Sequence, residues 1–289
     1  MGIGFLEYAR MEISSVRLFS YSSEYSEKAK AASEHENRLL TAEEHAQMSE
    51  IDFEDHFSSI DKLFKWYFCY LSNIKKLGVI TAIGEEIKAG NARNIISFGA
   101  GPSVLEYMLK MIFQEDVHMV VTDYDNWLVE HVSNLMPNLY ANTFDFYHDD
   151  PSPLINEHRI DTAIMIGSAC SMDNETYIKF LKRLYNCGVC NILTFEAGVS
   201  RKRDLFTAYI MKLLHICKNL VLWFFRNKQY EERKMRFLKY ERCFHAVSRT
   251  RRELERIYSR GGYLFSEMGY VDPYLCSYRL TMEKDENHD

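Results

Sequence analysis

NIISFGAGPSVLEY, residues 94–107, passes from an apolar run through two glycines into a second apolar run of helical composition. Glycine adopts left-handed backbone angles without a steric penalty, so Gly99 and Gly101 suit a tight turn between a strand and a helix. The missing side chains would also let a ligand lie on the backbone, where a helix start offers unpaired N–H groups and a positive dipole end. The stretch therefore predicts a strand–turn–helix joint, which either simply connects two elements of an α/β domain or binds a nucleotide-like ligand.

The bulk composition describes a globular protein with a large core. Of the 289 residues, 47% are hydrophobic and 14% aromatic, which suits one large domain or one domain with an accessory part. The net charge of -6 argues against a dedicated nucleic-acid-binding protein. The seven cysteines are scattered, as expected for reduced thiols. CGVC at 187–190 has no second ligand pair, so we expect no metal site.

The N-terminus shows no targeting signal. Glu7, Arg10 and Glu12 stand where a signal peptide would have its apolar run, and no apolar run reaches membrane-spanning length. We therefore expect a cytoplasmic protein.

Apolar strands alternate with helices through the middle of the chain. Strands are expected at 94–98, 117–122, around 141–147, 161–167 and 190–196, and helices at 102–114, 126–136, 174–186 and 250–260. A loop with Pro151 and Pro153 follows the third strand, and a hairpin is expected on either side of Gly269 and Asp272. Continuous apolar strands separated by helices indicate a parallel sheet covered on both faces. The predicted fold is α/β, with a doubly wound, mostly parallel seven-stranded sheet and a C-terminal antiparallel hairpin.

The chain divides into four parts. These are a helical N-terminal cap region at 1–74, a Rossmann-like cofactor-binding core at 75–199, a helical insertion at 200–245, and a last helix with the β-hairpin at 246–289. Charged helices are expected within 22–60, and residues 61–90 show an apolar face at helical spacing.

The order of these elements, together with three motifs, resembles the class I S-adenosylmethionine-dependent methyltransferases. Residues 94–103 look like the first motif of that family, and Asp123 looks like the acid that follows its second strand. Asp149 lies twelve residues before Asp161, which is close to the family's usual spacing. The resemblance implies S-adenosylmethionine as the cofactor, and transfer of its methyl group to an O or N atom of a small or medium-sized acceptor.

Two positions depart from the family pattern. Ser97 stands where the family often has an acid, two residues before the first glycine, and Ser103 stands at its usual third glycine. A catalytically inactive methyltransferase-like scaffold therefore stays an alternative. Another alternative is an NAD(P)-dependent oxidoreductase on a Rossmann sheet, whose fingerprint needs a glycine where this chain has Val104.

The resemblance also implies a set of cofactor-binding residues: Ser97, Gly99, Ala100, Gly101, Asp123, Tyr124, Asp149, Asp150, Gly167 and Ser168. The Asp123 carboxylate is expected to accept hydrogen bonds from both ribose hydroxyls. Asp149 or Asp150 is a candidate acceptor for the adenine amino group. Gly167 and Ser168 are expected to face the sulfonium. Tyr124 is expected either to pack on the cofactor or to be an ordinary core residue.

Methyl transfer is an in-line displacement, so aligning the reactants can supply much of the acceleration. A base is useful only when the acceptor is a hydroxyl or a protonated amine. The candidate bases are His148, Glu196, His215 and His245, each of which can also be interpreted as a structural polar residue.

Residues 204–226 are amphipathic and lie within a basic region. Residues 200–260 hold 17 Lys and Arg against 6 Asp and Glu. Three interpretations stay open: a helix packed between the main domain and the N-terminal helices, a lid over the acceptor pocket, or a basic helix on an anionic membrane. The charge favours an anionic neighbour, which could be an anionic acceptor, the acidic N-terminal helices, or a second copy in a homodimer. Nucleic acid is disfavoured, since no recognisable nucleic-acid-binding module is present.

Overall fold

The computed structural model describes residues 57–70, 73–199, 213, 214, 217, 249–268 and 275–282. The helices expected within 22–56 and almost all of the insertion at 200–245 lie outside these residues, so the boundaries of the four parts stay predictions. None of the helices in the described part of the chain combines the length and the hydrophobicity needed to cross a lipid bilayer.

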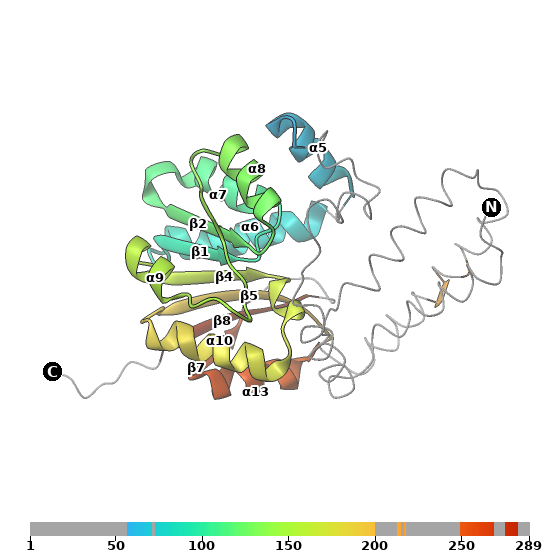
Figure 1. The fold of residues 1–289 in the computed structure, drawn as a ribbon. Coiled ribbons are helices and arrows are strands. Elements are labelled where there is room, and N and C mark those ends of the chain that lie inside the picture. The colour runs from blue at the N-terminus through green and yellow to red at the C-terminus, as the bar shows by residue number, and fades with distance from the viewer. Residues whose placement is uncertain are drawn as a thin grey trace.

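Five parallel strands form the body of the sheet: β1 (Asn94–Phe98), β2 (His118–Asp123), β3 (Tyr140–Thr143), β4 (Thr162–Ile166) and β5 (Asn191–Val199). An antiparallel hairpin of β7 (Tyr263–Glu267) and β8 (Leu275–Met282) completes it, with β8 beside β5. The order β3-β2-β1-β4-β5-β8-β7 (Figure 1) confirms the expected doubly wound sheet and its terminal hairpin. The two-residue strand β6 (Arg249–Thr250) pairs with the end of β5 and was not predicted from the sequence.

Apart from α9, the α-helices lie close to their expected positions. They are α5 (Ile60–Tyr70), α6 (Asn73–Lys88), α7 (Val104–Phe113), α8 (Asn126–Leu135), α9 (Ser152–His158), α10 (Asn174–Asn186) and α13 (Arg251–Gly261), with the short 3₁₀ turns η2 (Gln114–Asp116) and η3 (Ser168–Ser171). The apolar face expected within 61–90 is confirmed at Leu63, Ile83 and Ile87, which are buried, but not at Leu77, which has the same helical spacing and is exposed.

Helix α9 corrects the sequence analysis, which expected a loop here because of Pro151 and Pro153. Pro151 occupies the N-cap position and Pro153 lies in the first turn. Proline is tolerated there, because first-turn N–H groups have no partner within the helix and the fixed φ of proline suits a helix start. The third strand is also shorter than expected and ends at Thr143.

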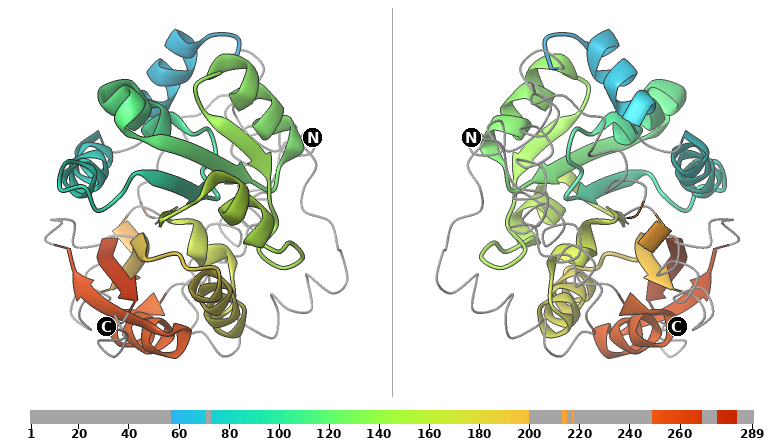
Figure 2. Two further views of the ribbon diagram at one scale, coloured as in Figure 1. Left: turned by 90° about the vertical axis from the view of Figure 1, so that its left-hand side faces the viewer. Right: turned by 90° about the vertical axis from the view of Figure 1, so that its right-hand side faces the viewer.

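Helices cover both faces of the sheet, as Figure 2 shows. Helices α5 to α8 share one buried apolar cluster with the sheet, and α9, α10 and α13 share another. Successive residues of β1 alternate between the two, since Ile95 belongs to the first cluster and Ile96 to the second. Burial on both faces explains why the parallel strands read as continuous apolar runs.

Helices α10 and α13 approach each other closely at Gly261. A Cβ atom added at this position would lie 2.7 Å from the Leu181 Cβ atom. In α6, by contrast, a Cβ added at Gly84 would lie 3.4 Å from the nearest atom, on Phe113, which is an ordinary contact. Gly84 lies inside α6 and Gly261 is the last residue of α13, so the two glycines differ in their position in the helix as well as in the neighbouring side chain.

We predict that Gly261→Ala destabilises the protein by about 1–3 kcal/mol, because overpacking against Leu181 outweighs the gain of about 1 kcal/mol in helix propensity. The matched control, Gly84→Ala, should be neutral or stabilising by up to about 1 kcal/mol. Denaturant unfolding of the three proteins measures both effects. Equal stabilisation by the two substitutions would contradict the close approach of α10 and α13.

Candidate functional site

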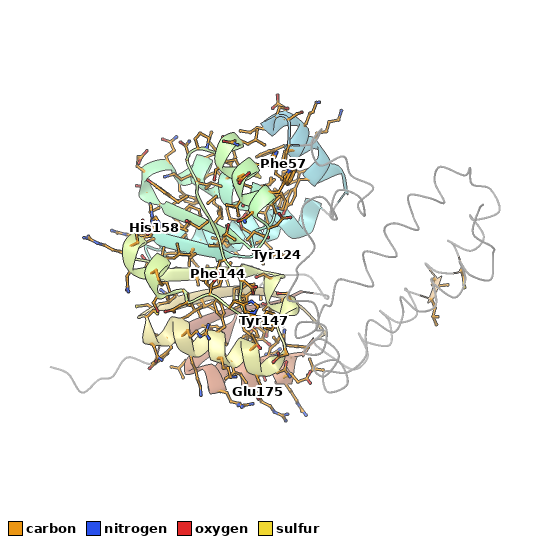
Figure 3. All side chains as sticks on the ribbon, in the orientation of Figure 1. Phe57, Tyr124, Phe144, Tyr147, His158 and Glu175 are labelled. Atoms are coloured by element: carbon orange, nitrogen blue, oxygen red, sulfur yellow. The ribbon has the colours of Figure 1, made fainter. Side chains whose placement is uncertain are left out.

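The carboxyl ends of the parallel strands meet at one edge of the sheet. In Figure 3, Tyr124, which follows β2, marks this edge, and His158, at the end of α9, lies toward the opposite one. The strand order reverses at β1, because β2 and β3 continue on one side of it and β4 and β5 on the other. Ligands of open α/β sheets bind outside such a reversal point, so a site is expected at the loops that follow β1 and β4.

The loop after β1 turns through three left-handed residues. The φ angles of Gly99, Gly101 and Ser103 are 66°, 55° and 54°. Serine fits at the third of these positions, because its hydroxyl donates to the Gly101 carbonyl over 3.3 Å and its N–H donates to the Ala100 carbonyl over 3.0 Å. The chain therefore keeps a left-handed turn where the family pattern has its third glycine.

Gly99 brings this turn against the loop after β4. A Cβ atom at Gly99 would lie 2.6 Å from the Ser168 Cβ atom, which leaves no room for a side chain. At Gly101 and Gly167, in contrast, none of the described residues places an atom within 4 Å of an added Cβ. The first glycine therefore closes the joint between the two loops, whereas the described residues would leave room for a side chain at the other two.

Asp123, at the end of β2, is tied to the glycine turn. Its Oδ2 atom accepts a hydrogen bond from the Gly101 N–H over 2.9 Å, and its Oδ1 atom accepts one from the Asp125 N–H over 3.2 Å. Burial raises the pKa of Asp123, although these two N–H groups and that of Tyr124 favour the ionised form. A carboxylate therefore lies directly beside the open backbone at Gly101.

Ser97 has a carboxylate as its partner. The Ser97 hydroxyl donates to Oε1 of Glu106, on α7, over 2.7 Å, and both residues are buried. Burial raises the pKa of Glu106 to about 6, and the bond from Ser97 partly offsets this rise. The negative charge of Glu106 in turn contributes to the raised pKa of Tyr67, on α5, although burial is the larger cause. An acid therefore does lie beside the position where the family pattern has one, but helix α7 supplies it.

Sequence reasoning missed Glu106. Within VLEYMLK the residue looks like an ordinary helical glutamate, yet it is buried together with Val104, Leu105 and Leu109. The available signal was an acid among the apolar inward-facing residues of a helix that directly follows a glycine turn.

The polar residues after β3 bond to one another. Asp149 accepts from the Asp145 N–H over 2.7 Å, and Asp150 accepts from the N–H and hydroxyl of Ser152 at the start of α9. The exposed His148 ring lies 2.8 Å from an oxygen of Asp145, and this bond raises its pKa. Asp145, which sequence reasoning did not single out, organises the turn. The adenine contact proposed for Asp149 or Asp150, and the role of His148 as a base, stay predictions.

Glu196 lies on the face of β5 that α10 covers. The Tyr177 hydroxyl donates to its Oε1 atom over 3.5 Å, and the side chain is only 2% exposed. Burial raises its pKa to about 7, and the nearby Arg249 guanidinium acts in the opposite direction. The residue therefore belongs to a buried cluster rather than to the loops after β1 and β4. The other two candidate bases, His215 and His245, lie outside the described residues.

The side chain of Ser168 has a buried hydroxyl group. Its Oγ atom is buried and has no hydrogen-bond partner among the residues that the structure describes. Since a buried hydroxyl without a partner is unfavourable, this atom is suited to bond a ligand at the adjoining turn. Within the described ranges, no group of three or more His, Cys, Asp or Glu side chains is arranged to hold a metal ion.

No protein-family model matches this chain, and no curated protein matches it. Solved structures do. The S-adenosylmethionine-dependent methyltransferase SibL, in its apo form, is 11% identical, with a TM-score of 0.55 over 96% of this chain and 70% of that chain.

Two further structures match with lower TM-scores. Human N-acetylserotonin methyltransferase, in complex with S-adenosylmethionine, is 13% identical, with a TM-score of 0.49 over 90% of this chain and 67% of that chain. Magnesium protoporphyrin IX methyltransferase from Synechocystis PCC 6803, with bound S-adenosylhomocysteine, is 11% identical, with a TM-score of 0.48 over 80% of this chain and 98% of that chain. The likeness to SibL shows that the chain has the fold of an S-adenosylmethionine-dependent methyltransferase.

The buried Glu106 makes the stability of the protein depend on pH. Its pKa is about 6 in the folded protein against an ordinary value of 4.5, so the folded state binds more protons between these values. The free energy of unfolding should therefore fall, by about 2 kcal/mol, as the pH rises through this window. The Glu106→Gln variant should not show this fall in the free energy of unfolding. Denaturant unfolding of both proteins at pH 4.5 and pH 7.5 measures the fall. Glu196 contributes equally to the pH dependence of the free energy of unfolding in both proteins, so its effect cancels when the variant is compared with the wild type. A difference in stability between variant and wild type that is the same at both pH values would contradict the assignment.

Proposed function

We propose that this chain is an S-adenosylmethionine-dependent methyltransferase that modifies an O or N atom of a small or medium-sized acceptor. The observation that carries the proposal is the glycine turn after β1, where the Gly101 N–H is bonded to the Asp123 carboxylate and the backbone is open to a ligand. The fold shared with SibL supports the same assignment.

The side chains at this edge fit the polar groups of S-adenosylmethionine. The backbone N–H groups of Gly101, Asp125 and Tyr124 bond to the Asp123 carboxylate, which offers about four acceptor sites, so it has capacity left for a ribose hydroxyl. The buried Ser168 hydroxyl can bond a further polar group of the ligand. Glu106, held by Ser97, supplies negative charge that favours the positively charged methionyl part of the molecule.

The chemistry follows from what such a ligand carries. S-adenosylmethionine, when bound, supplies a methyl group on a positively charged sulfur. The residues of this chain then have to hold the ligand so that the acceptor atom, the methyl group and the sulfur lie in line. The glycine turn can hold the ligand in one orientation. A base is required only for some acceptors, and the geometry around His148 and Glu196 leads us to assign none.

The remaining parts of the proposal rest on the sequence. An anionic acceptor, a lid formed by the insertion, contact of 204–226 with a membrane surface, a homodimer and a cytoplasmic location all stay predictions. They depend on the basic region at 200–260, of which the structure describes only residues 213, 214, 217 and 249–260.

Ligand binding separates this function from its two alternatives. S-adenosylhomocysteine at 100 times its Kd should stabilise the protein by about 2.7 kcal/mol, whereas NADH and NADPH should have no effect. Thermal unfolding with each ligand measures this. Stabilisation by a nicotinamide cofactor alone would favour the oxidoreductase, and no response to millimolar S-adenosylhomocysteine would favour the inactive scaffold.

Asp123→Asn should weaken the binding of S-adenosylhomocysteine about tenfold, because a neutral amide replaces the charged acceptor of the ribose hydroxyls. The amide keeps an oxygen for a backbone N–H. Asp123→Ala keeps none, so it should also lower the stability of the unliganded protein by about 1–2 kcal/mol. Isothermal titration calorimetry and denaturant unfolding measure the two effects. Asp116→Asn, at an exposed acid of η2, is the matched control. Unchanged affinity in Asp123→Asn would refute the ribose contact.

A further inference from the structure

The 3₁₀ turn η3, which follows β4, is held by two side chains from distant parts of the chain. Arg249, in β6, donates through Nη1 to the Ala169 carbonyl over 2.9 Å, and through Nη2 to the Met172 carbonyl. Tyr147, which Figure 3 labels in the loop after β3, donates through its hydroxyl to the Ser171 carbonyl over 2.9 Å. Side chains from outside the turn therefore donate hydrogen bonds to three backbone carbonyls, two within η3 and one directly after it.

Arg249 is fixed in this position by further contacts. Its Nε atom donates to the Asn174 side chain over 2.9 Å, and its guanidinium lies 5.2 Å from the centre of the Tyr177 ring. The residue is only 2% exposed. A buried guanidinium is unfavourable unless its donors are paired, so this arrangement strongly favours one position of η3 relative to β6 and α10.

The effect of these contacts reaches Ser168, the first residue of η3. Its carbonyl accepts from the Ser171 hydroxyl over 2.7 Å, so its backbone is held as well. Its Cβ atom lies where a Gly99 side chain would be, and its own hydroxyl is buried without a partner in the described part of the chain. A fixed turn thus presents one unused hydroxyl beside the glycine turn.

We propose that Arg249 is a positioning residue of the ligand site: its fork of donors holds η3 so that the Ser168 hydroxyl is presented to the ligand at the glycine turn. The inference rests on the proposed function, because the ligand is taken to be S-adenosylmethionine or its demethylated product. Arg249 does not touch the ligand and acts through Ser168.

A purely structural role of Arg249 would be to neutralise Glu196 within the buried cluster. Arg249→Lys distinguishes the two roles, since lysine keeps the positive charge but lacks the planar fork that reaches two carbonyls and Asn174 at once. The variant should therefore remain folded, while the amide hydrogen of Met172, which bonds to the Ala169 carbonyl, should exchange faster with solvent.

The test is a double-mutant cycle on the affinity for S-adenosylhomocysteine, measured by isothermal titration calorimetry on wild type, Arg249→Lys, Ser168→Ala and the double variant. Each single substitution should weaken binding about fivefold. The double variant should bind no more weakly than Arg249→Lys alone, because the hydroxyl is already misplaced there. Additive losses, about 25-fold in the double variant, would overturn the inference, as would unchanged affinity in Arg249→Lys.

Two controls keep the result interpretable. If Arg249→Lys does not fold, a variant with both Arg249→Met and Glu196→Gln replaces it in the cycle, because this pair of substitutions removes both buried charges together. The affinity of that variant is then compared with the affinity of Glu196→Gln alone, the reference variant. The reference variant should bind S-adenosylhomocysteine as the wild type does, because Glu196 contacts Tyr177 and not η3. A wild-type protein that does not bind this ligand would overturn the proposed function and the inference together. A wild type that binds, with an additive cycle, would overturn the inference alone.

Discussion

The close approach of Gly99 to Ser168 is the contact on which the candidate site depends. The backbone leaves β1 in a left-handed conformation and passes so near the loop after β4 that any side chain at Gly99 would collide with it. This contact joins the two loops at the point where the strand order reverses. Gly101, and the bond from its N–H to Asp123, lie around that joint. A larger residue at Gly99 would separate the loops and remove the geometry that a ligand requires.

Two buried glutamates lie near this edge on opposite faces of the sheet. Different groups offset the cost of burying each carboxylate. Glu106 belongs with the α7 face and accepts a hydrogen bond from the neutral Ser97 hydroxyl. Glu196 lies on the α10 face, where Tyr177 donates to it and the Arg249 charge stabilises its ionised form. In both cases burial is the larger effect and the pKa rises. Such shifts are expected wherever a carboxylate is withdrawn from water without a fully charged, well-placed partner. Glu106 therefore lies beside the glycine turn of the candidate site, whereas Glu196 lies in the buried cluster with Tyr177.

The sheet and most helices could be predicted from the sequence, because each signal was local. Apolar runs such as NIISF mark strands buried on both faces, and the glycines that follow mark the turn. The exception was α9, where Pro151 and Pro153 were interpreted as loop residues although proline fits a helix start. Of the residues that the sequence assigned to the candidate site, Gly99, Gly101, Asp123 and Ser168 lie together at one edge, and their role in binding a ligand stays a prediction. Glu106 and Arg249 were missed, because their importance comes from burial and partners far along the chain.

The sequence by itself determined the order of strands and helices, the position of the glycine turn and the acid after β2, since these follow from hydrophobic periodicity and from the backbone freedom of glycine. Only the tertiary structure decided which polar groups have hydrogen-bond partners among the described residues and which do not. Asp123 is bonded to Gly101, Asp150 to Ser152 and Glu106 to Ser97, whereas the Ser168 hydroxyl has no partner among the described residues. The physical reason is that hydrogen-bond partners are set by distances across the fold, between residues as far apart as Ala169 and Arg249, and no local pattern in the chain encodes them.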